Sequence, residues 1–421
     1  MPRDARLLLF SQFFGSLPIG TLLVFFPLYM HDIGTKSILI GGLITGAGIG
    51  SSLLLMAIGP LADRFGRREF LIAGTALPTA GLCIFTMTTN TGWLVVASML
   101  GGVGFSGGMG GGLVTATFNP MLAGLVEPRR RTLALSYAEV AWVTALGAGA
   151  LLAGAPSLVA QAGILTPLAA DRALFILCVI SSLAATILLL PVGKERHPIK
   201  QAPGAPRHGG RRQGKLPRGL IARLAVFFTL QGLGLGMVVQ LLPLWFALRF
   251  NTSAGAIAPL FSAAQLVGFP LVLLVPYLAK RFGVATLILV VAITSTVLLA
   301  GLPIATSLPL AGALFIARSG FVSMQWPAQH SFLQGAVDPK IRATVTSITL
   351  GCWSTANAVA PFFAGYLFDR KLLSLPLVLG VSCYGAAALW FLLTLRHIPL
   401  PEEQDEATSP GLMEIGVATA G

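Results

Sequence analysis

The residues VEPRRRT at positions 126–132 recur as VDPKIRA at positions 337–343, which lie 211 residues further along the chain. The same offset pairs Trp142 with Trp353, so the match extends beyond the two short motifs. Self-similarity at a fixed offset is typical of a protein built from repeated units. We therefore expect the second half of the chain to repeat the fold of the first half.

A second match supports this repeat and aligns it with the apolar stretches of the chain. PLADRFG (60–66) corresponds to PYLAKRFG (276–283), and each motif ends a long apolar stretch. The second copy is one residue longer and carries Lys280 where the first copy carries Asp63. The two matches together make the second apolar stretch equivalent to the eighth, and the fifth equivalent to the eleventh.

The composition indicates a protein embedded in a membrane. Hydrophobic residues make up 55% of the 421 residues and charged residues only 10%, with a mean hydropathy of +0.82. Soluble domains carry about 25% charged residues, so soluble enzymes, nucleic-acid-binding modules and secreted disulfide scaffolds are excluded. The net charge of +13 lies in short clusters between apolar runs. The four cysteines lie inside apolar runs, which indicates packing residues rather than disulfides or metal ligands.

Twelve apolar stretches are long enough to cross the hydrocarbon core as helices, which takes about 20 residues. They lack the alternating pattern of membrane β-strands, so we predict an all-α membrane protein. Together with the repeat, they predict two six-helix bundles related by a pseudo-two-fold axis along the membrane normal. The predicted spans are 7–30, 37–62, 69–90, 92–118, 132–154, 173–193, 221–247, 254–279, 284–306, 309–334, 344–368 and 375–395.

The spans divide the chain into four parts. Residues 1–193 are predicted to form the N-terminal bundle, 194–219 a basic linker, 220–397 the C-terminal bundle and 398–421 a disordered tail. With the N-terminus in the cytoplasm, 22 Lys and Arg residues lie on the cytoplasmic side and 5 on the other. Because cytoplasmic loops carry the excess of basic residues, we expect a cytoplasmic-membrane protein with both termini inside.

The loop after the second span, GPLADRFGRR (59–68), resembles the signature loop of the major facilitator superfamily. The twelve spans, the repeat and the basic central segment extend this resemblance over nearly the whole chain. It implies that Asp63 latches onto the start of the eleventh helix, near Thr344, and that breaking this contact lets the bundles part on the cytoplasmic side. The alternative is a basic loop that only fixes orientation. The implied gating residues are Gly59, Asp63, Arg64, Gly66, Arg67 and Arg68.

Two charged residues lie well inside predicted spans, Glu139 in the fifth and Arg318 in the tenth. Ions within a membrane cost at least about 2.5–3.5 kcal/mol each, so both are candidate functional residues. Glu139 can be a proton-coupling carboxyl, a partner of Arg318 or of a cationic substrate, or a structural acid bonded to Ser136 or Tyr137. Arg318 can bind a polar or anionic group of the substrate, pair with Glu139, or be tied to carbonyls of its own bundle.

Further polar and aromatic side chains fall at depths compatible with a cavity between the bundles. Binding sites of this kind are mostly apolar with a few placed polar groups. The alternative for each amide is a hydrogen bond between helices. Many drug/proton antiporters of the family carry an arginine in the fourth helix, whereas this chain has Gly107 at the position that matches Arg318. The candidate substrate-binding residues are Arg318, Gln231, Gln265, Gln325, Asn357, Trp142 and Trp353.

These features predict a secondary transporter that moves a small organic molecule by alternating access, with proton-coupled efflux of an amphipathic compound as the leading hypothesis. The alternatives are proton-coupled uptake of a sugar or carboxylate, and a non-transporting sensor built on the same fold. We expect no enzymatic activity, metal or cofactor, because the sequence shows no nucleophile-base pair, metal-ligand spacing or nucleotide-binding loop. The expected partners are the substrate, protons and the lipid bilayer, without nucleic acid, and we expect a monomer.

Overall fold

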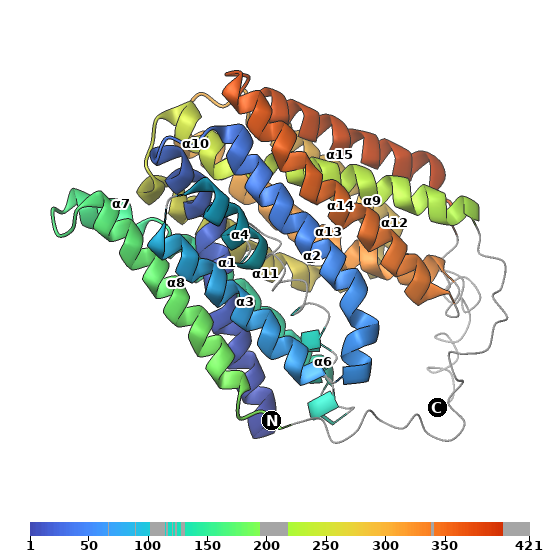
Figure 1. The fold of residues 1–421 in the computed structure, drawn as a ribbon. Coiled ribbons are helices and arrows are strands. Elements are labelled where there is room, and N and C mark those ends of the chain that lie inside the picture. Colours follow the sequence, from blue (N-terminus) through green and yellow to red (C-terminus); the bar gives the residue numbers. More distant parts are fainter. Residues whose placement is uncertain are drawn as a thin grey trace, which may run out of the picture.

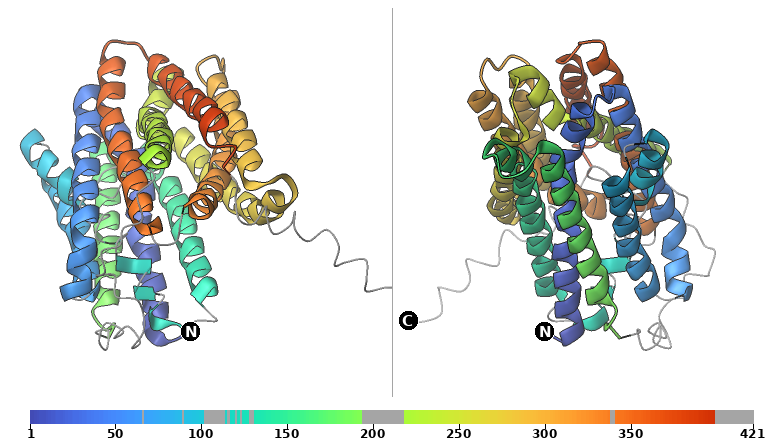
Figure 2. Two further views of the ribbon diagram at one scale, coloured as in Figure 1. Left: turned by 90° about the vertical axis from the view of Figure 1, so that its right-hand side faces the viewer. Right: turned by 60° about the vertical axis from the view of Figure 1, so that its left-hand side comes forward.

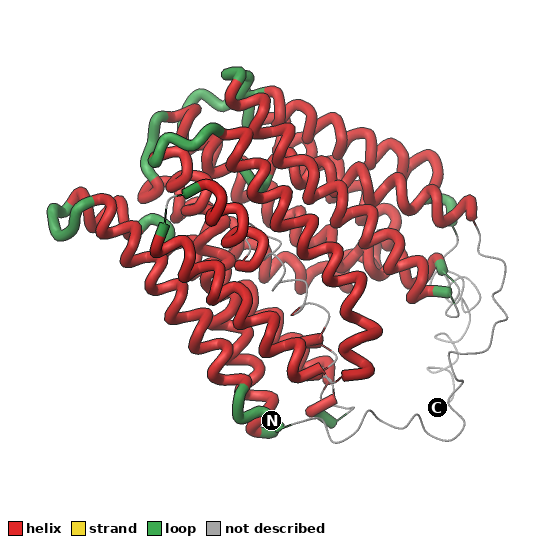
Figure 3. The backbone as a smooth tube through the Cα atoms, in the orientation of Figure 1, coloured by secondary structure: helices red, strands yellow, loops and turns green. Residues whose placement is uncertain are grey.

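The computed structural model consists of long helices packed side by side (Figure 1). It describes residues 1–65, 67–88, 90–101, 114, 117–119, 121–122, 124–127, 131–193, 218–337 and 341–398. Every regular element within these ranges is a helix, which confirms the predicted all-α class (Figure 3).

The helices of the first half are α1 (Arg3–Asp32), α2 (Ser37–Phe65), α3 (Arg67–Met87), α4 (Thr91–Gly101), α6 (Arg131–Leu152), α7 (Ala155–Gln161) and α8 (Pro167–Leu189). Those of the second half are α9 (Arg218–Val238), α10 (Leu242–Phe250), α11 (Ala254–Phe282), α12 (Val284–Gly301), α13 (Leu308–Ala336), α14 (Arg342–Asp369) and α15 (Leu375–Thr394).

Each predicted span overlaps a helix in the described part of the chain, although several spans extend a few residues beyond the helix end. By length and hydropathy, 8 candidate membrane spans are found in the described part of the chain. The fourth span is seen as α4 only, because most of its remaining residues lie outside that part. Two details differ from the prediction. The seventh span is divided into α9 and α10, with Pro243 in the first turn of α10, where its missing N–H costs little. The short helix α7 was not predicted.

The first bundle is organised around α1, which packs against α6 and α8. Gly20 and Gly149 allow the backbones of α1 and α6 to meet. A Cβ atom at Gly20 would overlap the backbone of Leu146, and one at Gly149 would overlap that of Leu17. Small residues at helix contacts favour this close packing in membranes, where van der Waals contact drives association.

Contacts between its first and last residues close the first bundle at one end. The backbone N–H of Gly193 donates to Asp4 Oδ2 over 3.1 Å, which joins the exit of α8 to the start of α1. The predicted linker starts one residue later, and most of it (194–217) lies outside the described ranges. Residues 218 and 219 of the predicted linker already belong to α9.

The second bundle repeats this arrangement around α9, which packs against α14 and α15. Cβ atoms at Gly232 and Gly236 would overlap the carbonyl oxygens of Trp353 and Asn357, respectively. In the same bundle α13 packs against α11 and α12. The close contact between the first and fifth helices of each half is what the sequence repeat predicts.

The two bundles lie beside each other along two seams (Figure 2). In one seam α2 packs against α14, and in the other α6 packs against α11. Because the repeat makes α2 equivalent to α11 and α6 equivalent to α14, the pseudo-two-fold relates the two seams. We refer to the end of the bundles where α1 ends and α2 begins as the distal end, and to the opposite end as the proximal end.

Candidate functional site

The second bundle buries a set of amide and guanidinium groups that have open hydrogen-bonding atoms. Their exposed fractions are 2% to 6%. The atoms without a hydrogen-bond partner are Gln231 Nε2, Arg318 Nε, Gln325 Nε2, Gln329 Nε2 and Asn357 Oδ1. An unmade hydrogen bond at a buried polar group costs about 1–3 kcal/mol. Groups of this kind need a partner, and a bound molecule can supply one.

Helix α13 carries three of these residues on one face. Arg318, Gln325 and Gln329 are separated by seven and four residues, which brings their side chains within about 40° of one another around a helix of 3.6 residues per turn. The face extends about 16 Å along the helix axis. It therefore presents a column of nitrogen donors.

Arg318 is held inside its own bundle. Its guanidinium lies over the ring of Tyr384 on α15, with the central carbon 5.2 Å from the ring centroid. The ring of Tyr384 lies where a Cβ atom on Gly234 of α9 would stand, so that glycine makes room for it. A cation over an aromatic face is an attractive contact. Among the guanidinium nitrogens, Nε is buried without a hydrogen-bond partner.

An aromatic group adjoins the donor column. Trp326 of α13 lies 5.1 Å from Trp353 of α14, measured between ring centroids, and 4.8 Å from His330. Trp326 is 41% exposed, so this group reaches the surface of the bundle. Indole rings provide apolar contact area beside the buried amides, which suits a ligand with both polar and flat apolar parts.

Glu139, Trp142 and Gln265 lie on α6 and α11, the two helices of the other seam. Glu139 is on α6 and exposed, and it makes no hydrogen bond or ion pair with the rest of the described chain. Trp142 is half-buried on the same helix. Gln265 is half-buried on α11 and precedes Leu266, which packs against Gly147 of α6. In this conformation Glu139 and Arg318 belong to separate groups, since Arg318 lies against Tyr384.

Residues 8–361 match the family model described as Major Facilitator Superfamily. The chain belongs to the major facilitator superfamily. The predicted resemblance is thereby confirmed, and with it the two-bundle fold of a membrane transporter. No similar chain is found among curated protein sequences.

Solved structures show the same major facilitator fold. The D-xylose-proton symporter is 16% identical with a TM-score of 0.73, and the match covers 94% of this chain and 98% of that one. The nucleoside transporter NupG is 13% identical with a TM-score of 0.72, covering 94% and 100%. A bacterial homologue of the iron transporter ferroportin, in an inward-facing state, is 16% identical with a TM-score of 0.72, covering 93% and 98%. At these identities the likeness establishes the fold and carries over no substrate.

The major facilitator signature loop is only partly described. Gly59, Asp63 and Arg64 lie in the helical backbone of α2, and the side chains of Asp63, Arg64 and Arg67 lie outside the described part of the structure. Gly66 lies outside it altogether. The predicted contact between Asp63 and the start of the eleventh helix therefore stays a prediction.

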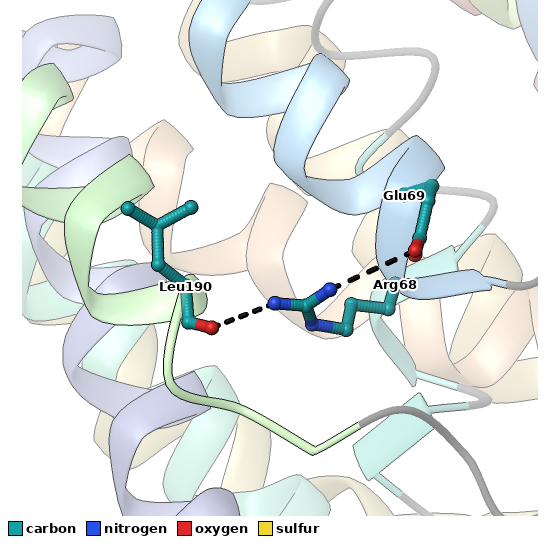
Figure 4. Close-up of polar contacts among 3 residues, drawn as sticks. All are labelled: Arg68, Glu69 and Leu190. Carbon is teal, nitrogen blue, oxygen red and sulfur yellow. Dashed lines mark hydrogen bonds and ion pairs between the residues drawn. The ribbon is translucent and has the colours of Figure 1, made fainter.

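Arg68 is the one predicted gating side chain that is described. Its Nη2 donates to the carbonyl oxygen of Leu190 over 2.6 Å, and its Nη1 lies 3.6 Å from Glu69 Oε1 (Figure 4). The first contact ties the start of α3 to the end of α8, inside the first bundle. In this conformation Arg68 therefore connects the end of the signature loop to its own bundle.

Three residues that the structure brings into the argument, Trp326, Tyr384 and Asp369, were not predicted from the sequence. Tyr384 was missed because a tyrosine in a span is most often a packing residue, and no spacing pairs it with Arg318. Asp369, at the distal end of α14, bonds to the start of α2. The only signal for it was that acids are scarce in this chain, 15 in 421 residues, and this one ends a helix.

Proposed function

We propose that this transporter carries a small amphipathic organic molecule out of the cell by alternating access, driven by protons. The open donors on α13, next to the Trp326–Trp353 pair, carry the proposal. Their partner must offer hydrogen-bond acceptors to the amides and guanidinium, and an apolar surface to the indoles. A neutral or weakly acidic compound with an aromatic or aliphatic part meets both requirements.

Glu139 is the proposed proton-coupling residue. It is an intramembrane acid that is exposed and makes no contact with Arg318, so its proton does not depend on a fixed ion pair. It lies on α6, one of the helices that form the seams. When the bundles move, the surroundings of a carboxyl on such a helix change between wet and dry, which makes it bind and release a proton.

The second candidate is proton-coupled uptake of a sugar or carboxylate. It draws on the same buried amides, because sugar hydroxyls and carboxylates both accept hydrogen bonds from such donors. In this case Arg318 is the ligand for the anionic or hydroxyl-rich group, and the indoles pack against the sugar ring. The two candidates differ in the direction of transport and in the need for an apolar part.

A transport assay in proteoliposomes separates the two. The purified protein is reconstituted, a pH gradient of either sign is imposed, and movement of amphipathic dyes, sugars and carboxylates is measured. Efflux predicts proton-dependent movement of amphipathic compounds opposite to the proton flow, whereas uptake predicts sugar or carboxylate movement with it. Liposomes without protein and a protonophore serve as controls. Gradient-independent movement of every compound would contradict proton coupling.

We also propose that the proximal end and both termini face the cytoplasm, with the protein acting as a monomer in the cytoplasmic membrane. Two exposed positions test the orientation, Ile164 (71% exposed) after α7 and Phe282 (54% exposed) at the end of α11. Single cysteines there, in a background without the four native cysteines, should react with an impermeant thiol reagent from opposite sides. In intact cells only Ile164→Cys should be labelled, and labelling of Phe282→Cys alone would reverse the topology.

A further inference from the structure

The two bundles are joined at the distal end by a carboxylate that caps a helix of the other bundle. The backbone N–H groups of Ser37 and Ile38, at the start of α2, donate to Asp369 Oδ1 and Oδ2 over 2.8 and 2.9 Å. Asp369 is the last residue of α14. Residues more than 330 positions apart thus share two hydrogen bonds across the seam.

The contact matches the electrostatics of a helix N-terminus. The first N–H groups of a helix have no acceptor inside it and carry a partial positive charge. An N-cap residue normally supplies the acceptor, but the residue before α2 is Lys36, which has none and whose charge has the unfavourable sign there. The second bundle therefore provides the cap that the sequence of α2 lacks.

The charge of Asp369 is also unfavourable for the dipole of its own helix, α14. A negative charge at a helix C-terminus opposes the helix dipole. The last turn of α14 thus bears the wrong charge for its own dipole, and Lys36 bears the wrong charge for that of α2. The α2 N-terminus stabilises the Asp369 carboxylate electrostatically when the two helix ends are together. Separation removes this interaction and leaves an unfavourable charge at each helix end.

The seam below this contact is close and partly polar. A Cβ atom at Gly365 would overlap the carbonyl oxygen of Ser37, and one at Gly41 would overlap that of Pro361. Deeper along the seam, the hydroxyl groups of Ser52 and Ser354 lie 2.5 Å apart. The backbones therefore hold the distal ends of α2 and α14 in the register that the capping bonds require.

Among the described residues, the pseudo-two-fold-related seam has no equivalent of this carboxylate. At the offset of 211 residues, Asp369 corresponds to Leu158 in α7. Leu158 and Ser157 pack against Gly255 in the first turn of α11, and the N-cap residue of α11, Ser253, makes no side-chain capping bond. Within the described ranges, the capping contact is found at the α2–α14 seam and not at the α6–α11 seam.

We infer that Asp369 is a gating residue that holds the distal end closed, and that opening of this end in the transport cycle breaks its two bonds to α2. The inference rests on the proposed alternating access, because only a protein that opens distally has to break this contact. The result is a built-in preference for the state closed at the distal end. Asp369 acts on the conformational equilibrium and not on the substrate.

Distance measurements between spin labels test the inference without a substrate. Ile33 follows α1 and Leu372 follows α14, and both are exposed at the distal end, at 38% and 46%. Each is changed to cysteine and labelled in a background whose native cysteines are replaced by alanine. In the parent protein the short-distance population should predominate. Asp369→Ala should raise the ratio of long to short distances about tenfold, a size typical of losing a helix cap.

Two further variants make the test specific. Asp32→Ala removes an exposed acid at the same end of the bundles, the last residue of α1, for which no bond to α2 is seen, so it should leave the distances unchanged. Ser37→Pro removes one donor at the first helical position, where proline is tolerated, so it should shift the distances in the same direction as Asp369→Ala. Combined with Asp369→Ala it should add little, because both changes break the same contact.

The outcomes separate the gating role from the proposed function. A distance shift in Asp369→Ala but not in Asp32→Ala supports the gating role, even if none of the tested compounds is transported. Equal distance distributions in the parent, Asp369→Ala and Ser37→Pro proteins, all monodisperse and helical by circular dichroism, would overturn it. Transport of a compound by these variants at the parent rate, with unchanged distances, would overturn the gating role and leave the proposed function standing.

Discussion

The two bundles satisfy their buried polar groups in different ways. In the described part of the first bundle these groups are mainly serine and threonine hydroxyls, which donate to nearby backbone carbonyls, and Arg68 Nε is an unpartnered exception. Ser11 donates to the carbonyl oxygen of Ala185, Ser181 to that of Phe14, and Thr21 to that of Leu17. In the second bundle they include amides and a guanidinium with unpartnered atoms, such as Gln325 and Arg318.

The difference follows from the number of donors. One hydroxyl needs one acceptor, and a carbonyl already used in a helix can accept a second bond. An amide has two N–H donors and a guanidinium has five, which is more than neighbouring helices in a membrane readily satisfy. Hydroxyl groups therefore contribute to packing, whereas open amides and guanidinium groups suit recognition. We infer that the second bundle holds most of the substrate-binding contacts.

The largest effect is expected from Arg318. Arg318→Met keeps the length of the side chain and removes its charge and donors, so transport should fall at least about a hundredfold, as with loss of a buried charged partner. The proteoliposome assay measures the rate. Arg223→Met changes an exposed arginine of the same bundle and should have no effect. Near-normal transport by Arg318→Met would mean that Arg318 only fills space beside Tyr384.

The next effect concerns Glu139, a proposed functional residue that lies in the first bundle and not in the second. Glu139→Gln cannot release a proton, so it should abolish uphill transport driven by a pH gradient and spare substrate exchange at equal concentrations. Counterflow and gradient-driven uptake are measured on the same liposomes. Glu127→Gln alters an exposed acid near the same helix as the control. Gradient-driven transport that survives in Glu139→Gln would exclude this residue as the coupling site.

The third effect separates recognition from stability at Gln325. Gln325→Leu removes an amide nitrogen that has no partner, so the thermal midpoint should stay the same or rise, while substrate affinity falls about ten- to hundredfold. Binding and thermal unfolding are measured on the same sample. Gln161→Leu, at the exposed end of α7, controls for the substitution. If Gln325→Leu lowers the midpoint by several degrees, the amide is a structural contact.

The smallest effect should come from the hydroxyls of the first bundle. Ser11→Ala removes one buried hydrogen bond and should cost about 1 kcal/mol of stability without changing transport. Ser382→Ala, whose exposed hydroxyl bonds within its own helix, should cost less. Denaturation midpoints in mild detergent give the comparison. A loss of transport in Ser11→Ala would show that the first bundle also takes part in recognition.

Much of this architecture follows from the sequence. Apolar length gave the spans, and the repeat of VEPRRRT and VDPKIRA predicted the equivalence of α6 and α14. Hydropathy could not reveal the break between α9 and α10, because the apolar stretch continues through it. Hydropathy does not predict how one helix is rotated against another, so it could not predict the contact of Arg318 with Tyr384. No sequence pattern identifies Asp369, because its partners are backbone N–H groups, which nearly all residues carry.

The contacts that close the first bundle also bear on the order of events during synthesis. Asp4 accepts a hydrogen bond from Gly193, and Arg68 donates one to Leu190. Residues 190 and 193 are among the last of the first half to be synthesised, so these contacts can form once the first half is complete. Translation at about 5–20 residues per second leaves roughly 10–40 seconds before the roughly 200 residues of the second half are made. The first half can thus assemble in the membrane alone, and the second half then folds against a finished template.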